Sequence, residues 1–174
     1  MNSKWRTTVI LGLAVAAVAY VFFTNVTVPK VGSDVGDAAP DFQASSYQGE
    51  KLSLSSFEED VVILNMWASW CEPCTEEIPA LIDIHENYQS EGLTLVTLNM
   101  NSYERTREDG ENFVKELDMT RTPALIDEDG SIAEVYNIQA LPTTYIIDRN
   151  GIIVEKISGE VSFAQLDQII QEYM

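Results

Sequence analysis

The pentapeptide Trp70-Cys71-Glu72-Pro73-Cys74 decides how this sequence is interpreted, because it contains both cysteines of the 174-residue chain. It follows an apolar, β-branched run, residues 61–66, which predicts a buried strand. It opens a segment, residues 76–88, in which apolar side chains recur with the period of a helix. The two cysteines are therefore expected where a strand leads into the N-terminus of a helix.

This position favours thiol chemistry. The N–H groups and dipole of a helix N-terminus stabilise a thiolate, which makes Cys71 the expected nucleophile. Cys74, three residues later, is close enough to resolve a mixed disulfide. Two cysteines and the single histidine, His85, cannot complete a zinc site of four cysteines or of two cysteines and two histidines. We therefore interpret the pair as a redox-active disulfide that works without a metal or an organic cofactor.

The N-terminal 28 residues predict a cytoplasmic stub and one transmembrane signal-anchor. Residues 7–23 carry no charge and are mostly apolar, and Lys4 and Arg6 precede them. This bias places the N-terminus in the cytoplasm and the remaining chain on the extracytoplasmic side of the cell membrane. A cleaved signal peptide, cut after Ala17-Val18-Ala19, is the alternative.

The remaining chain is expected to form a tether, residues 29–38, and one folded domain, residues 39–174. All 28 acidic residues follow the apolar segment, and with 10 basic residues the chain has a net charge of −18. Such a charge repels nucleic acid, so no nucleic-acid partner is expected. A salty or alkaline medium and a basic partner explain this charge equally well.

The pattern of the domain predicts an α/β fold. After an N-terminal β-hairpin extension, strands and helices alternate, and a second hairpin and a helix follow. This order implies a mixed central sheet flanked by helices. The expected elements, besides the strand and helix around the cysteines, are a hairpin at 42–54, a helical turn at 55–57, strands at 93–100, 124–126, 143–147 and 152–157, and helices at 107–117, 132–136 and from Ser162.

Two motifs together resemble the thioredoxin superfamily: Trp67-Ala68-Ser69-Trp70-Cys71-Glu72-Pro73-Cys74 early in the domain and Leu141-Pro142-Thr143-Thr144 late in it. More narrowly, residues 35–173 resemble the membrane-anchored, extracytoplasmic thiol–disulfide oxidoreductases of the ResA/TlpA type. The resemblance implies a thioredoxin-like fold.

The resemblance also implies how substrate is bound. The bond before Pro142 is expected to be cis and to face the cysteine pair, where its peptide group can pair with an extended substrate segment. Leu141 and Pro142 are thus expected to contact substrate together with Trp70, Glu72 and Pro73. Plain core packing is the alternative for Trp70, and a simple turn is the alternative for Pro142.

Glu77 is the third candidate catalytic residue. It follows Cys74 by three residues, so helical geometry puts both on one face. In the ResA-type family a glutamate at this position lies by the active site and affects cysteine acidity. Ordinary thioredoxins have a buried aspartate six residues before the first cysteine, where this chain has Asn65. Glu77 is therefore the expected proton acceptor for Cys74, and a solvated surface carboxylate like Glu76 is the alternative.

The acidic surroundings of the cysteines predict a reductant. Glu72, Glu76 and Glu77 disfavour a thiolate on Cys71 by like charge, so the reduced form is not strongly stabilised. By resemblance, the substrate is the haem-site disulfide of apocytochrome c, reduced during cytochrome c maturation, and a membrane thiol electron donor of the CcdA type restores the dithiol.

Other functions stay open. The protein can be a general thiol–disulfide oxidoreductase for secreted proteins, an oxidase or isomerase that makes disulfides, or a binding module without activity. Ala39-Pro40-Asp41-Phe42 is shared with peroxiredoxins, which suggests a thiol peroxidase. The residues before Cys71 argue against a peroxidase, because they lack the proline and threonine of that family's motif.

Overall fold

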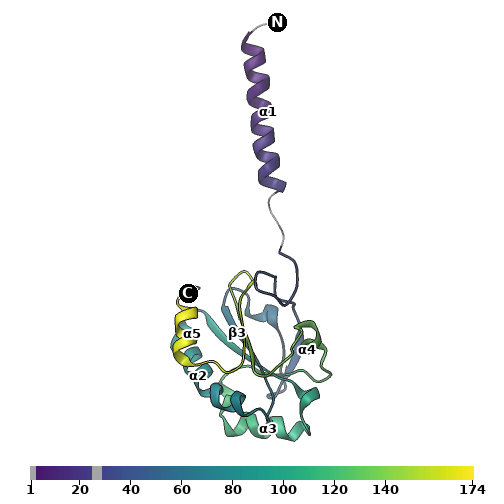
Figure 1. Cartoon of the computed structure of the whole chain (residues 1–174), viewed down its shortest axis with the longest axis vertical. Helices are drawn as coiled ribbons and strands as arrows, with labels where there is room; N and C mark the ends of the chain where they lie inside the picture. Colours follow the sequence, from purple (N-terminus) through teal and green to yellow (C-terminus); the bar gives the residue numbers. More distant parts are fainter. Residues whose placement is uncertain (1–2, 25–28) are drawn as a thin grey trace.

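The computed structural model describes residues 3–24 and 29–174. Helix α1 (Ser3–Thr24) precedes the folded domain (Figure 1). Among these described residues, no helix combines the length and the apolar character that a membrane crossing requires. The predicted anchor covers residues 1–28, of which residues 1–2 and 25–28 lie outside the described part. The anchor stays a prediction.

The domain is built on a mixed seven-stranded sheet, which confirms the predicted α/β fold. The strand order is β2-β1-β5-β4-β3-β6-β7. The central strands β3, β4 and β5 are parallel, whereas β6 and β7 at one edge and β1 and β2 at the other are antiparallel. The strands are β1 (Gln43–Ser46), β2 (Lys51–Ser53), β3 (Val61–Trp67), β4 (Leu93–Asn99), β5 (Ala124–Ile126), β6 (Thr143–Ile147) and β7 (Ile153–Ser158).

Helices cover both faces of this sheet, as Figure 1 shows with α2 and α5 on one side and α4 on the other. Side chains of α2, α3 and α5 join one buried cluster, and side chains of α4 join the second. The N-terminal hairpin extends the sheet, since β1 pairs with β5. The helices after α1 are α2 (Glu72–Tyr88), α3 (Arg107–Glu116), α4 (Ser131–Val135) and α5 (Phe163–Ile170), with short 3-10 turns at Leu54–Phe57, Gln89–Glu91, Asn101–Tyr103 and Met119–Arg121.

Every residue of β3 is buried, which explains why its sequence is apolar except at Asn65. Its side chains alternate between the two clusters: Ile63 lies in the cluster under α2, and Leu64 lies in the one under α4. This alternation turns Asn65 toward α2. A polar side chain in the middle of β3 is therefore placed under the helix that begins at the cysteine pair.

The segment predicted as a tether, residues 29–38, makes backbone hydrogen bonds to the sheet. The Gly36 N–H donates to the carbonyl of Ile153 at 2.8 Å, and the Ile153 N–H donates to the carbonyl of Asp37 at 2.9 Å. The β6–β7 turn next to Ile153 lies at the end of the sheet where β3 begins. The chain therefore enters the domain at the end opposite to the one where β3 leads into α2.

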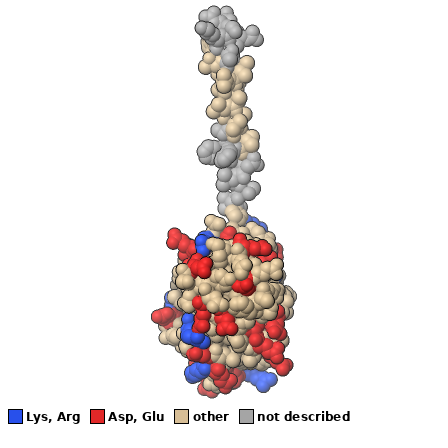
Figure 2. Space-filling view, turned by 90° about the vertical axis from the view of Figure 1, so that its left-hand side faces the viewer, with Lys and Arg blue, Asp and Glu red and all other residues tan. Residues whose placement is uncertain are grey.

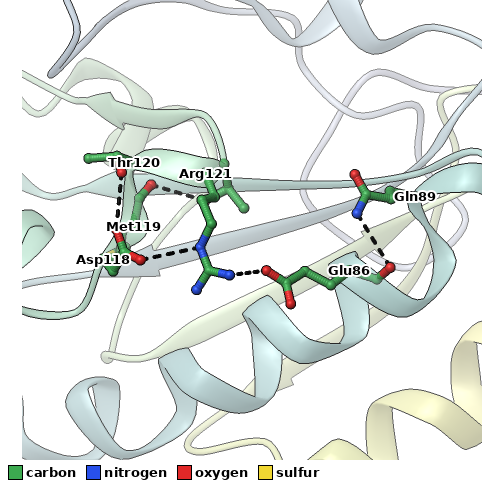
Figure 3. Close-up of polar contacts among 7 residues, drawn as sticks. Glu86, Gln89, Asp118, Met119, Thr120 and Arg121 are labelled. Carbon is green, nitrogen blue, oxygen red and sulfur yellow. Dashed lines mark hydrogen bonds and ion pairs between the residues drawn. The ribbon is translucent and has the colours of Figure 1, made fainter.

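An ion-pair cluster joins the turn after α3 to α2 (Figure 3). The guanidinium of Arg121 points between Glu86 on α2 and Asp118, and its Nε lies 3.4 Å from Asp118 Oδ2. All three side chains are substantially exposed. Exposed ion pairs of this kind contribute about 0–1 kcal/mol each to the free energy of unfolding. The position of α2 therefore depends mainly on its buried side chains and not on this cluster.

Among the charged side chains on the face of the domain seen in Figure 2, acidic ones are more extensive than basic ones. This distribution follows from the net charge of −18. It keeps the domain soluble, and self-repulsion between the carboxylates destabilises the folded state.

Candidate active site

Cys71 and Cys74 form a disulfide at the N-terminus of α2, with an S–S distance of 2.06 Å. Cys71 is the N-cap residue, and its Sγ accepts a hydrogen bond from the Cys74 N–H at 3.3 Å. Pro73 lies in the first turn, where a missing N–H breaks no helical hydrogen bond. The first sulfur thus lies where backbone N–H groups favour negative charge.

The two cysteines differ in exposure. Cys71 is 4% exposed and Cys74 is completely buried, so of the two cysteines only Cys71 has any access to solvent. Around them, Glu72 and Pro73 are exposed, and the Trp70 side chain is 53% exposed. Cys71 thus has limited access to solvent and directly follows an exposed tryptophan in the chain.

The peptide bond between Leu141 and Pro142 is cis, as the resemblance implies. Pro142 is buried and Leu141 is partly buried. The next residue, Thr143, pairs with Met66 on β3. Because β3 leads from there into the cysteine pair, the cis bond and Cys71 lie at the same end of the sheet.

Glu77 is buried, with 1% of its surface exposed, so it is not a solvated carboxylate like Glu76. Its Oε1 accepts a hydrogen bond from Asn65 Nδ2 at 2.7 Å, and its Oε2 accepts one from the Val161 N–H at 2.9 Å. Asn65 Nδ2 also donates to Thr144 Oγ1 at 3.0 Å. The carboxylate is therefore held by β3 and by the loop before α5, and through Asn65 it is linked to β6.

Burial raises the pKa of Glu77 from 4.5 to about 7. Hydrogen bonds from Val161 and Asn65 stabilise the carboxylate and oppose this shift, whereas the charge of Glu160 adds to it. A carboxyl group with a pKa near neutrality can accept and return a proton at physiological pH, which is what a general base for a thiol requires. Cys74 and Glu77 lie one helical turn apart on α2.

Trp67, from the first motif, and His85, the single histidine of the chain, contribute to packing. Trp67 is fully buried and stacks on Phe113, with ring centroids 4.5 Å apart. His85 is half-buried at the back of α2, and its Nδ1 lies 3.3 Å from the Leu95 N–H. Burial lowers the pKa of His85. Trp67 thus packs β3 against α3, and His85 links α2 to β4.

Sequence reasoning missed a hydrogen-bonded cluster beside the cysteines. Glu104 accepts hydrogen bonds from the N–H and the Oγ of Ser69, both at 2.6 Å, and from Asn99 Nδ2 at 2.7 Å. The Trp70 indole N–H donates to the carbonyl of Tyr103 at 2.8 Å. The only signal in the sequence was that this polar loop follows β4, the parallel neighbour of β3, so both loops leave the same end of the sheet.

Comparisons with known proteins agree with this geometry. A match to the AhpC/TSA family covers residues 35–156. The thioredoxin-like protein YneN of Bacillus subtilis is 33% identical over 97% of both chains. The thiol–disulfide oxidoreductase ResA of Oceanobacillus iheyensis is 34% identical over 94% of this chain and 85% of its own.

A solved structure described as the thiol:disulfide interchange protein DsbE of Chlorobium tepidum is also similar. It has a TM-score of 0.73 and 29% identity, and the match covers 80% of this chain and 97% of the other. The fold is thus thioredoxin-like, and the site is a Cys-X-X-Cys redox pair. The chain belongs to the AhpC/TSA family, and it is a thiol–disulfide oxidoreductase of the ResA type.

Proposed function

We propose that this protein is a reductant of protein disulfides on the extracytoplasmic side of the membrane. The observation that carries the proposal is the disulfide at the N-terminus of α2, in which Cys71 is 4% exposed and Cys74 is fully buried, with the buried Glu77 three residues further along the same helix. The proposed substrate is the haem-site disulfide of apocytochrome c, and other secreted proteins are the alternative. A membrane thiol donor of the CcdA type supplies the electrons, and residues 1–28 anchor the domain.

The proposed cycle balances two electrons. The Cys71 thiolate attacks one sulfur of the substrate disulfide, which forms a mixed disulfide and releases the first substrate thiolate. Glu77 takes the proton of Cys74, whose thiolate attacks Cys71 Sγ. The second substrate thiol leaves, and the protein is left with the Cys71–Cys74 disulfide. The donor dithiol reduces this disulfide by the same exchange steps in reverse.

Substrate is proposed to bind across the surface around Cys71. Trp70, Glu72 and Pro73 lie close to Cys71 in the chain and are exposed, and the peptide group between Leu141 and Pro142 is proposed to supply the backbone edge on the β6 side. An extended segment can pair with that edge while its cysteine reaches Cys71.

Trapping tests the proposal directly. In a Cys74→Ala variant the mixed disulfide on Cys71 cannot be resolved, so substrates stay covalently attached and can be identified after non-reducing electrophoresis. The expected partners are secreted proteins with a reducible disulfide, including apocytochrome c. The double variant Cys71→Ala/Cys74→Ala is the control. Capture that does not depend on Cys71 would contradict the mechanism, and capture that never includes apocytochrome c would leave only the broader substrate class.

A further inference from the structure

We propose that Glu104 is a positioning residue that holds the active-site loop, residues 68–71, in the geometry needed for exchange with protein substrates. The inference rests on the thiol–disulfide exchange reaction and does not depend on which protein is the substrate. Glu104 lies in the loop between β4 and α3, outside the Cys-X-X-Cys motif, and its contacts reach the residue two positions before Cys71.

Both oxygens of the Glu104 carboxylate bind the same loop residue. Oε1 accepts from the Ser69 N–H and Oε2 accepts from the Ser69 Oγ, both at 2.6 Å. Hydrogen bonds to an ionised acceptor are roughly twice as strong as those between neutral groups. A carboxylate therefore fixes the main chain and the side chain of Ser69 together, which a neutral side chain with one acceptor oxygen cannot do as well.

The carboxylate is itself supported from the core. Its Oε1 also accepts from Nδ2 of the fully buried Asn99, and Asn99 Oδ1 accepts from the Tyr47 hydroxyl at 3.0 Å. Gly110 on α3 leaves the space for this contact, because a Cβ there would lie 2.3 Å from the Tyr47 oxygen. Burial and then the charge of Glu104 raise the pKa of Tyr47, so its hydroxyl stays a donor.

The loop after β3 and the loop after β4 are joined by two further hydrogen bonds, besides those of Glu104. The Met100 N–H donates to the carbonyl of Trp67 at 2.9 Å, and the Trp70 indole N–H donates to the carbonyl of Tyr103 at 2.8 Å. The Trp70 indole is thereby anchored, while 53% of the residue remains exposed next to Cys71 in the chain. A rigid, exposed aromatic ring reduces the ordering cost when a polypeptide binds.

The inference predicts a selective defect. Without Glu104 the loop that carries Trp70 loses both hydrogen bonds at Ser69, so docking of a polypeptide next to Cys71 becomes less productive. The chemistry at the Cys71 sulfur, set by the α2 N-terminus, is retained. Misplacement of a reacting group by about 1 Å can lower a rate by roughly 100-fold, and we expect a loss of about 10-fold or more for protein substrates.

The test compares Glu104→Ala and Glu104→Gln with Glu108→Ala in the full chain. Glu108 is an exposed acidic residue at the start of α3, so its variant controls for the lost charge. Reduction of insulin disulfides, recycled by dithiothreitol, measures exchange with a polypeptide. Alkylation of the reduced protein by iodoacetamide measures Cys71 without docking. Exchange of the Ser69 amide hydrogen and the NMR signal of the Trp70 indole N–H report on the loop itself.

Glu104→Ala should reduce kcat/KM for insulin about 10-fold or more, accelerate exchange of the Ser69 amide and shift the Trp70 signal, while the alkylation rate changes much less. Glu104→Gln should lie between Glu104→Ala and the unmodified chain, and Glu108→Ala should match the unmodified chain. If Glu104→Ala does not fold, the same measurements on the nearly isosteric Glu104→Gln decide whether Glu104 positions the loop. Unchanged insulin kinetics in Glu104→Gln with an unchanged Ser69 amide, or equal losses in insulin reduction and alkylation, would overturn the proposal. A chain that reduces no insulin at all would instead contradict the proposed function.

Discussion

The Nδ2 atom of Asn65 lies 2.7 Å from Oε1 of Glu77, in the interior of the domain beneath α2. An amide thus stands where ordinary thioredoxins have an aspartate, and it donates to a glutamate one helical turn after Cys74. Because Asn65 cannot titrate, the only carboxyl group of this pair is on Glu77. Because of this raised pKa, we expect the proton of Glu77 to affect both the stability and the exchange chemistry.

Glu77 should make the stability of the oxidised protein depend on pH. The folded protein keeps the Glu77 proton up to a pKa of about 7, whereas an unperturbed glutamate loses it near 4.5. Between these values the folded state binds more protons, so the free energy of unfolding falls as the pH rises and stays lower above pH 7. The full effect is on the order of 3 kcal/mol.

Denaturant unfolding of the oxidised protein across this pH range checks the expectation, with Glu77→Gln as the variant. The disulfide-bonded cysteines do not titrate in this form. The variant should lose the downward slope between pH 4.5 and about 7, whereas Glu76→Gln on the exposed side of α2 should keep it. Parallel curves for the unmodified chain and Glu77→Gln would show that Glu77 has the same pKa in the folded and unfolded states.

In the reduced protein, Glu77→Gln should slow disulfide exchange, because the neutral amide keeps the shape of the side chain but cannot take a proton. It should also lower the pKa of the cysteines, since a nearby negative charge is removed. The two effects oppose each other at Cys71, so the rate must be followed from about pH 5 to about pH 9. Unchanged rates and an unchanged thiol titration over this range would exclude the proposed base.

Alkylation of the reduced protein should modify Cys71 before Cys74. Cys71 is the N-cap of α2 and retains 4% exposure, whereas Cys74 is buried one turn inside. Peptide mapping after a short treatment with iodoacetamide at neutral pH measures the order. The Cys71→Ala variant shows how fast Cys74 reacts alone. Faster labelling of Cys74 than of Cys71 would exchange the two proposed roles.

The fold could be predicted from the sequence because its signals are local. The continuous apolar run at residues 61–66 became the fully buried β3, and Ser162 caps α5 by accepting a hydrogen bond from the Gln165 N–H. For the majority of strands and helices, the predicted and observed bounds differ by no more than two residues. The position of Glu77 near the cysteines also follows from helical spacing alone.

The cluster around Glu104 could not be predicted, because it depends on contacts between distant segments. Ser69 and Glu104 are 35 residues apart, and Tyr47 and Asn99 are 52 residues apart. No periodicity marks such pairs. The burial of Glu77 was equally hidden, since its sequence neighbour Glu76 is exposed and both are glutamates on one helix. Helical spacing puts Glu77 on the face of Cys74, but only the structure shows that Asn65 and Val161 hold its carboxylate in the interior.

Removal of the Arg121 guanidinium should have a small effect on stability. Arg121→Met loses the ion pairs with Glu86 and Asp118, and all three side chains are substantially exposed. We expect a decrease of about 0.5 kcal/mol in the free energy of unfolding, smaller still at high salt. A double-mutant cycle with Glu86→Gln measures the coupling. A coupling energy above about 2 kcal/mol would show that the ion pairs of Arg121 contribute substantially to the stability of the domain, which would contradict this prediction.

The midpoint potential of the Cys71–Cys74 pair should be reducing, on the order of −270 mV. The N-terminus of α2 favours the Cys71 thiolate, but Glu72 in the first turn and the buried Glu77 disfavour it, so the dithiol form gains little stability. Equilibration with glutathione buffers, read out by trapping the free thiols, measures the potential. Glu72→Gln should raise it slightly, because an exposed charge is screened by water and salt. A potential above about −180 mV would place the protein among disulfide-forming catalysts and contradict its role as a reductant.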